Sequence, residues 1–414
     1  MAHTLFIIII CIVVFNYLFG LLLDYLDSTR WSNVLPQELE GIYDAEKYRK
    51  SQDYEKVTMR FSLVSGAFTF IILIAMLVSG GFAWTDAFVR GYTQNPILMA
   101  LMFFALLAFA FDIITTPFSV YHTFVIEQKF GFNTTTQKTF VLDKIKTWLL
   151  SAILGGGILT FIVWIYGATG PWFWFVAWMT MTGFSVFMSL FYSNIIVPLF
   201  NKQKPLDEGE LRNAIKEFAD KAGFKLKNIF VINGSKRSKK ANAYFTGFGQ
   251  KKRIVLYDTL MNDFTNEEIV AILAHEIGHY KKKHVMYGLV TSIITSGILF
   301  YIMSLVIGSP DVAGALGASD ASFHMGILAF GMLYSPFSMI LGIAGNMISR
   351  KHEYAADRYA VTKYKPEAMT SGLKKLYVST LSNLRPHPFT VFITYSHPTL
   401  LQRLAAIAKS QEAK

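Results

Sequence analysis

The chain has little charge for its size and almost no cysteine. Only 16% of its 414 residues are charged, whereas soluble domains carry about 25%. The single cysteine, Cys11, excludes an internal disulfide and any zinc site built from cysteines. With 53% hydrophobic residues, the chain is too apolar for an ordinary soluble domain. These shortages predict a membrane protein.

The apolar residues fall in runs long enough to cross a bilayer, which takes about 20 mostly apolar residues. The first run is not expected to be a removable signal peptide, because nothing basic precedes it and no small-residue cleavage site follows. We therefore predict a mostly α-helical, multi-pass membrane protein with about seven transmembrane helices. The predicted spans are 5–23, 61–82, 96–114, 148–166, 172–192, 285–307 and 324–348.

Basic residues gather in alternate loops and set the predicted orientation. They are frequent in 24–60, in 117–146, between spans five and six and after span seven, and are rare elsewhere. The positive-inside rule then places the amino terminus outside and the carboxyl terminus in the cytoplasm. The net charge of +11 is explained by these loops, so we predict contact with anionic membrane lipid and no nucleic-acid partner. The compact length favours a bacterial cytoplasmic membrane over the endoplasmic reticulum, and nothing in the sequence specifies an oligomeric state.

One motif indicates catalysis: His275-Glu276-Ile277-Gly278-His279. Histidines four residues apart lie one turn apart on the same helix face, so both imidazoles can bind one metal ion. A glutamate directly after the first histidine can act as general base on a water at that metal. The motif predicts a zinc hydrolase with one Zn²⁺ per chain. The alternative reading is a structural helix with two incidental histidines.

A hydrolytic zinc ion keeps three protein ligands and one open position. Glu353 is the best candidate for the third ligand, because it is expected on a helix near the same membrane surface. Asp357 follows at i+4 and is expected to accept a hydrogen bond from a ligand histidine. His284 is expected to face away from the histidine pair, and no partner is predicted for His324.

The segments outside the membrane are predicted to form the catalytic part. Thr265 and Glu268 form a capping box that predicts the start of the motif helix, and this helix is expected to run straight on into span six. The residues after span seven are expected to continue that span as one helix. Further elements are predicted as a helix at 207–222, strands at 228–232, 243–248 and 253–257, and a last helix at 399–409. The expected regions are 1–200 with five spans, 201–284 with the motif, 285–348 with spans six and seven, and 349–414 as the cytoplasmic catalytic tail.

Five further fragments, in order along the chain, resemble the signatures of one family. That family is the type I CAAX prenyl proteases, which are integral-membrane zinc metalloproteases. The fragments are Phe124-Val125-Ile126-Glu127 with Phe130-Gly131-Phe132-Asn133; Pro198-Leu199-Phe200-Asn201; Asn242-Ala243-Tyr244-Phe245; Ser349-Arg350 through Glu353 to Asp357; and Ser396-His397-Pro398 with Arg403. The resemblance extends over nearly the whole chain.

The resemblance implies helices around an intramembrane chamber and removal of the last three residues from a peptide that ends in a prenylated cysteine. It implies the ligand set and the general base already named. It also implies substrate or transition-state contacts for His397 and Arg403, and an edge strand at Asn242 and Ala243 that binds substrate backbone. Residue type alone favours an ordinary loop position for His397. Lys239 and Lys240 depart from the family pattern, in which smaller or less basic residues are expected before Asn242. This departure leaves open which substrate residues the enzyme prefers on either side of the cleaved bond.

Two other functions are compatible with the residues alone. The first is a membrane quality-control metalloprotease that needs no prenyl group. The second is a helical transporter or scaffold with a structural metal, which would close its site with four protein ligands.

Overall fold

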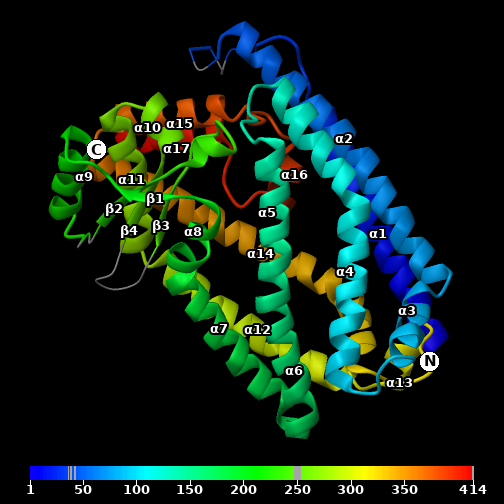
Figure 1. Ribbon diagram of the computed structural model, residues 1–414. Coiled ribbons are helices and arrows are strands. Elements are labelled where there is room, and N and C mark those ends of the chain that lie inside the picture. The colour runs from blue at the N-terminus through cyan, green and yellow to red at the C-terminus, as the bar shows by residue number, and fades with distance from the viewer. Residues whose placement is uncertain are drawn as a thin grey trace.

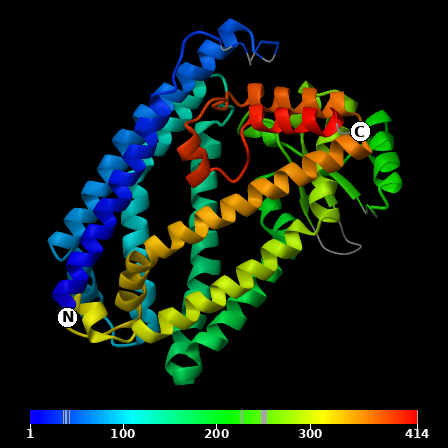
Figure 2. The same ribbon diagram turned by 180° about the vertical axis from the view of Figure 1, so that it is seen from behind.

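The structure is a computed structural model that describes residues 1–35, 37, 40–41, 43–224, 226, 228–246 and 253–412. Long helices form one part of the molecule, and a smaller α/β unit forms one end of it (Figure 1). The membrane helices are α1 (Ala2–Ser28), α2 (Ala45–Val78), α4 (Pro96–Tyr121), α5 (Gln137–Leu150), α6 (Gly156–Thr169), α7 (Phe173–Ile195), α12 (His284–Val306) and α14 (Phe323–Lys363). Helices α1, α2 and α4 form one side, α7 and α12 form the other, and α5–α6 and α14 cross between them on opposite faces (Figures 1 and 2).

Six uninterrupted helical stretches among the described residues are long and apolar enough to cross a membrane. The longest, Gln137–Phe200, reverses its direction at Gly170 (Figure 1), where φ is 51°. Glycine adopts a positive φ at little cost, and α6 and α7 contact each other beyond the turn. This stretch therefore contributes two spans. All seven predicted spans fall mainly on helical segments, although the second, 61–82, runs past the end of α2 at Val78. The two termini lie at opposite ends of the molecule (Figure 1).

The α/β unit contains a four-stranded sheet of order β1-β2-β4-β3. Strands β2 (Asn228–Ile232) and β4 (Arg253–Tyr257) match the predicted bounds and pair in parallel. Strand β3 (Ala243–Thr246) pairs antiparallel with β4 and lies at the edge, and the last two residues predicted for it lie outside the described residues. Strand β1 (Gln203–Pro205) is not predicted by the sequence, because it has only three residues and ends in proline.

The remaining helices pack around this sheet or contact the membrane helices (Figure 1). The bounds are α3 (Gly81–Arg90), α8 (Val197–Phe200), α9 (Glu210–Lys221), α10 (Asp258–Asp263), α11 (Asn266–Lys281), α13 (Pro310–Gly314), α15 (Pro366–Ser379), α16 (Pro388–Thr394) and α17 (Leu400–Glu412). Helices α15 and α16 both begin at a proline, which lacks the N–H that a first helical turn leaves unbonded.

Helix α11 carries the motif and is buried in the core of the α/β unit. Its capping box is present, with Thr265 and Glu268 bonding each other's backbone. Gly278 lies so close to α14 that a Cβ there would be 3.1 Å from the Cα and the carbonyl oxygen of Ala356. The glycine inside the motif therefore permits the close approach of the helix that carries Glu353.

The prediction of one continuous helix from the motif into span six is wrong. Helix α11 ends at Lys281, and α12 begins at His284. Between them Lys283 has a φ of 59°, a left-handed conformation that interrupts the helix. By contrast, α14 runs without a break from span seven through Glu353, as the sequence predicts.

Candidate active site

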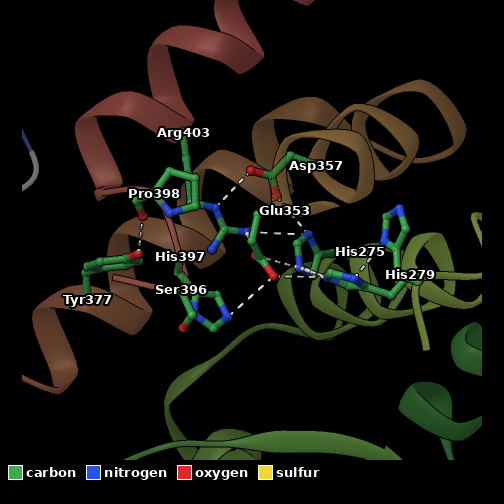
Figure 3. A network of polar contacts seen from close by, with 10 residues as sticks. His275, His279, Glu353, Asp357, Tyr377, Ser396, His397, Pro398 and Arg403 are labelled. Carbon is green, nitrogen blue, oxygen red and sulfur yellow. Dashed lines mark hydrogen bonds and ion pairs between the residues drawn. The ribbon is translucent and has the colours of Figure 1, made fainter. Parts of the chain in front are cut away.

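Three potential metal ligands converge from two helices. His275 and His279 come from α11 and Glu353 from α14, and their ligand atoms all lie within 4.8 Å of one another (Figure 3). The Nε2 atoms of the two histidines are 3.1 Å apart. Nε2 of His275 lies 3.4 Å from Oε2 of Glu353, and Nε2 of His279 lies 3.2 Å from Oε1. The donor atoms of all three side chains thus face one point.

The chemistry of this donor set fits a metal ion. Two imidazoles and one carboxylate are zinc ligands that leave a fourth position open. Within the described part of the chain, Oε2 of Glu353 is buried and has no hydrogen-bond partner. A buried carboxylate oxygen without a partner is costly in a protein alone, and coordination to a cation would satisfy it.

Asp357 orients the first histidine. Its Oδ1 lies 2.8 Å from Nδ1 of His275, on the side of the ring opposite to Nε2. This contact fixes the tautomer that presents Nε2 to a metal. Asp357 is itself held by Arg403, whose Nε and Nη2 donate to its two oxygens at 2.8 and 2.6 Å.

Arg403 is buried, with 5% of its surface exposed. Its guanidinium donates two hydrogen bonds to Asp357, and its Nη2 also lies 3.7 Å from Oε2 of Glu353. A guanidinium that binds a carboxylate through two bonds has a fixed direction. This geometry favours a positioning role for Arg403 over the substrate contact that the resemblance implies.

His284 supports the second histidine, contrary to the prediction that it faces away. Its Nδ1 lies 3.0 Å from Nδ1 of His279, and its ring stacks on that of His352 at 3.9 Å. The prediction assumed a continuous helix, whereas the break at Lys283 turns the His284 side chain back toward the site. No glycine marks this left-handed position, so local sequence patterns do not signal the turn.

Burial and hydrogen bonding act in opposite directions on His275. Burial disfavours its charged form, but the contact with Asp357 and the adjacent carboxylate of Glu353 outweigh this effect and raise the pKa of the imidazole to about 9. The raised pKa favours the charged form of the metal-free imidazole, with a proton on both ring nitrogens. A metal ion that binds Nε2 must displace the proton on that nitrogen, so binding is coupled to pH.

A cavity of about 790 Å³ opens next to the three ligands. His275, Glu276 and Glu353 all line it, so the Glu276 side chain borders the same space as two of the three ligands. Asn242 and Ala243 line it as well, where β3 begins at the edge of the sheet. One cavity is therefore bordered by metal ligands, by Glu276 and by the edge of strand β3.

Lys240, which departs from the family pattern, is directed to the membrane helices. Its Nζ lies 3.1 Å from Oε2 of Glu127, 3.1 Å from the hydroxyl of Tyr54 and 4.4 Å from the ring centre of Phe132. Its charge is therefore neutralised next to the strand edge.

His397 reaches the site from the loop between α16 and α17. Its Nε2 lies 3.4 Å from Oε1 of Glu353, and its Nδ1 bonds the hydroxyl of Ser396 at 2.9 Å (Figure 3). The side chain is 58% exposed and lines the cavity. The structure thus brings together the nine residues singled out in the sequence. Seven of them line the cavity, and the other two, His279 and Asp357, contact residues that line it.

A second buried polar cluster lies far from this site. His324, for which the sequence shows no partner, contacts Asp86 through Nε2, and Asp86 also accepts a hydrogen bond of 2.8 Å from Nε of Arg90. This cluster joins α3 to the start of α14. Asp86 and Arg90 belong to a short helix that hydropathy alone does not separate from the second span.

Comparison with known proteins agrees with this arrangement. Residues 25–202 match the family model described as the CAAX prenyl protease N-terminal region with five membrane helices, and residues 205–411 match peptidase family M48. The CAAX prenyl protease 1 homolog of Oryza sativa subsp. japonica is 34% identical, with 98% of each chain covered. CAAX prenyl protease 1 of Saccharomyces cerevisiae is 33% identical over 92% of this chain and 90% of its own.

The crystal structure of S. mikatae Ste24p has the same fold. It superposes with a TM-score of 0.92 at 31% identity and covers 97% of this chain and 99% of its own. The relatives named here are eukaryotic and give no support to the bacterial membrane predicted from chain length. They are proteases, which favours a protease over the transporter or scaffold alternative. This chain belongs to the CAAX prenyl protease 1 family and is a multi-pass membrane metalloprotease of peptidase family M48.

Proposed function

We propose that this chain is a zinc-dependent endopeptidase that removes the last three residues from peptides ending in a prenylated cysteine. The observation that carries the proposal is the convergence of His275, His279 and Glu353 beside the cavity, in a chain whose full-length relatives are named CAAX prenyl protease 1. The zinc ion would be held by these three side chains.

Zinc held at this point would act as a Lewis acid toward the scissile carbonyl and the attacking water. Glu276 takes a proton from that water and passes it to the leaving nitrogen, since it follows a ligand histidine directly and lines the same cavity. His397 donates a hydrogen bond or positive charge to the oxyanion that develops during attack. Asp357 and His284 hold the two ligand imidazoles in orientation from behind.

The substrate peptide would bind as an extra strand. Strand β3 lies at the sheet edge next to the cavity, so its outer backbone groups are available to an extended peptide. Asn242 and Ala243 lie at the end of this edge that borders the ligands. The prenyl chain or another hydrophobic segment would then lie toward the membrane helices and their lipid.

For the orientation, we infer that the amino terminus is outside and the carboxyl terminus is in the cytoplasm. The basic loops and the opposite positions of the two termini support it. The catalytic regions 201–284 and 349–414 would then face the cytoplasm. A reporter that is active only outside the cytoplasm should be silent when fused after Lys414 and active when inserted at 309–322; the reverse pattern contradicts this orientation.

The function is tested with a farnesylated peptide and its unprenylated twin. Purified protein with zinc should release the carboxyl-terminal tripeptide from the farnesylated peptide, as identified by mass spectrometry, and a chelator should stop the reaction. Equal cleavage of both peptides would favour the quality-control protease instead. Cleavage that persists after the removal of metal would contradict the proposed chemistry.

A further inference from the structure

We propose that Arg350 and Asn346 are positioning residues that hold His397 at the reaction centre. The inference rests on the proposed function of His397 and adds the residues on which that function depends. Neither residue belongs to the group of three metal ligands or lines the cavity, so we infer that they act through the loop that carries the histidine.

Arg350 binds the carboxyl end of α16. Its Nη1 donates to the carbonyl oxygens of Val391, at 3.0 Å, and Tyr395, and its Nη2 donates to that of Phe392 at 3.3 Å. Asn346 donates through Nδ2 to the carbonyl of Ile393 at 2.9 Å. The last carbonyls of a helix are mostly left without a partner inside the helix; Val391, whose carbonyl also accepts from the backbone N–H of Tyr395, is an exception here. Here two side chains of α14 supply partners for four carbonyls in the five residues from 391 to 395.

These two side chains lie on the same face of α14 as the site residues. Asn346, Arg350, Glu353 and Asp357 occupy positions i, i+4, i+7 and i+11, which form one stripe along a helix. From residue 393 to residue 403 the chain follows this stripe in the same order. Ile393 bonds Asn346, Tyr395 bonds Arg350, His397 lies next to Glu353, and Arg403 bonds Asp357. Figure 2 shows α14 running from the membrane helices to the α/β unit.

The stripe sets the distance between a metal ligand and the transition-state donor. Glu353 and the two anchoring side chains belong to one helix, so their separation is fixed by the helical rise. His397 is exposed and follows Tyr395 by only two residues. A reacting group displaced by about 1 Å can lose about a hundredfold in rate. Arg350 and Asn346 prevent this displacement, since they fix the backbone directly before the histidine.

The main test is Arg350→Lys in the full chain, which keeps the charge and removes the planar fork that binds several carbonyls. With the farnesylated peptide, kcat should fall by about tenfold or more while KM stays within about twofold. Zinc content should not change. Amide hydrogen exchange, measured by mass spectrometry, should accelerate in 391–397 and stay unchanged in α11. Arg358→Lys, at an exposed position of α14 outside the stripe, is the matched control and should behave like the wild type.

A double-mutant cycle separates positioning from a general structural effect. If Arg350 acts through His397, Arg350→Lys should cost almost nothing further, at most about twofold, in a His397→Ala background. Additive losses, or an Arg350→Lys enzyme with normal kcat, would overturn the inference. Asn346→Ala is a second test variant that removes a single contact. Its kcat should fall by about threefold, with little change in KM or zinc content. The single variant His397→Ala tests the proposed function of His397 separately from the inference about Arg350. A normal kcat in that variant would refute the proposed function.

Discussion

Nδ1 of His275 lies 2.8 Å from Oδ1 of Asp357, and this carboxylate also receives both arms of Arg403. The contact fixes which ring nitrogen of His275 faces the other two ligands. Asp357 and Glu353 are one turn apart on α14, so the helix that supplies the third ligand also orients the first one. Ligand geometry therefore depends on the α11–α14 contact that Gly278 permits.

Asp357→Asn should weaken zinc binding by about tenfold to a hundredfold, the usual cost of losing a group behind a ligand histidine. The amide keeps the size of the carboxylate but loses the charge that stabilises the histidine proton. Zinc content after dialysis against a graded chelator measures the effect. Unchanged zinc retention would mean that His275 needs no support from Asp357.

Arg403→Ala should lower the free energy of unfolding by about 3 kcal/mol, because it removes both guanidinium bonds and the compensating positive charge from the buried carboxylate of Asp357. Zinc retention should fall with it. Thermal unfolding in detergent and metal analysis check the two effects. A variant with normal stability and zinc content but a raised KM would instead support the direct substrate contact implied by the family resemblance.

Much of the site could be predicted because the ligands follow short-range rules. The i, i+4 spacing of His275 and His279 places both on one helix face, and the breaker-free stretch after span seven carries Glu353 and Asp357 on one helix. His284 could not be predicted, because its direction depends on the left-handed conformation of Lys283, which the sequence does not encode by a glycine. The pairing of Arg403 with Asp357 joins residues 46 positions apart, so local patterns do not reveal it.

Glu268→Gln should destabilise the α/β unit by about 2 kcal/mol. Glu268 is buried, caps α11 and accepts hydrogen bonds from Ser371 and Lys375 at 2.6 and 2.7 Å. Burial alone would raise its pKa, but the bonds from Lys375, Ser371 and Thr265 outweigh this and lower it. The stabilisation is therefore present above the ordinary pKa of 4.5 and is lost as the pH falls through the lower folded value.

The pH dependence supplies the check on this account of Glu268. Denaturant titrations of the wild type and of Glu268→Gln should differ at pH 7 and converge in strong acid, where the carboxylate is protonated. A difference that grows as the pH falls would contradict it. Glu267→Gln, which affects an exposed neighbour in the same first turn, is the control.

His397→Ala should lower kcat by about a hundredfold, with little change in KM, because a transition-state donor contributes little to substrate binding. Zinc content should stay at the wild-type level, since His397 is not among the three ligands. Steady-state kinetics with the farnesylated peptide and metal analysis measure both quantities. A variant that loses its zinc would identify His397 as a ligand, and one with normal kcat would return it to an ordinary loop position.

The fold shows the same division between local and long-range information. The seven apolar runs and strands β2 and β4 lie where composition and periodicity predict them. Strand β1 cannot be predicted, because three residues are too few to show a period. The His324–Asp86 contact cannot be predicted either, because it joins positions 238 residues apart. Residue type alone left His397 an ordinary loop residue, and only its place beside Glu353 in the structure shows which group it faces.

The central claim is that Glu276 is the general base beside a zinc ion held by His275, His279 and Glu353. Glu276→Gln keeps the shape of the side chain and removes its basicity. The most direct measurement is single-turnover cleavage of the farnesylated peptide by this variant, together with its zinc content. We predict one zinc ion per chain and a rate at least about a hundredfold below that of the wild type. A zinc-loaded variant that cleaves at the wild-type rate would contradict the account.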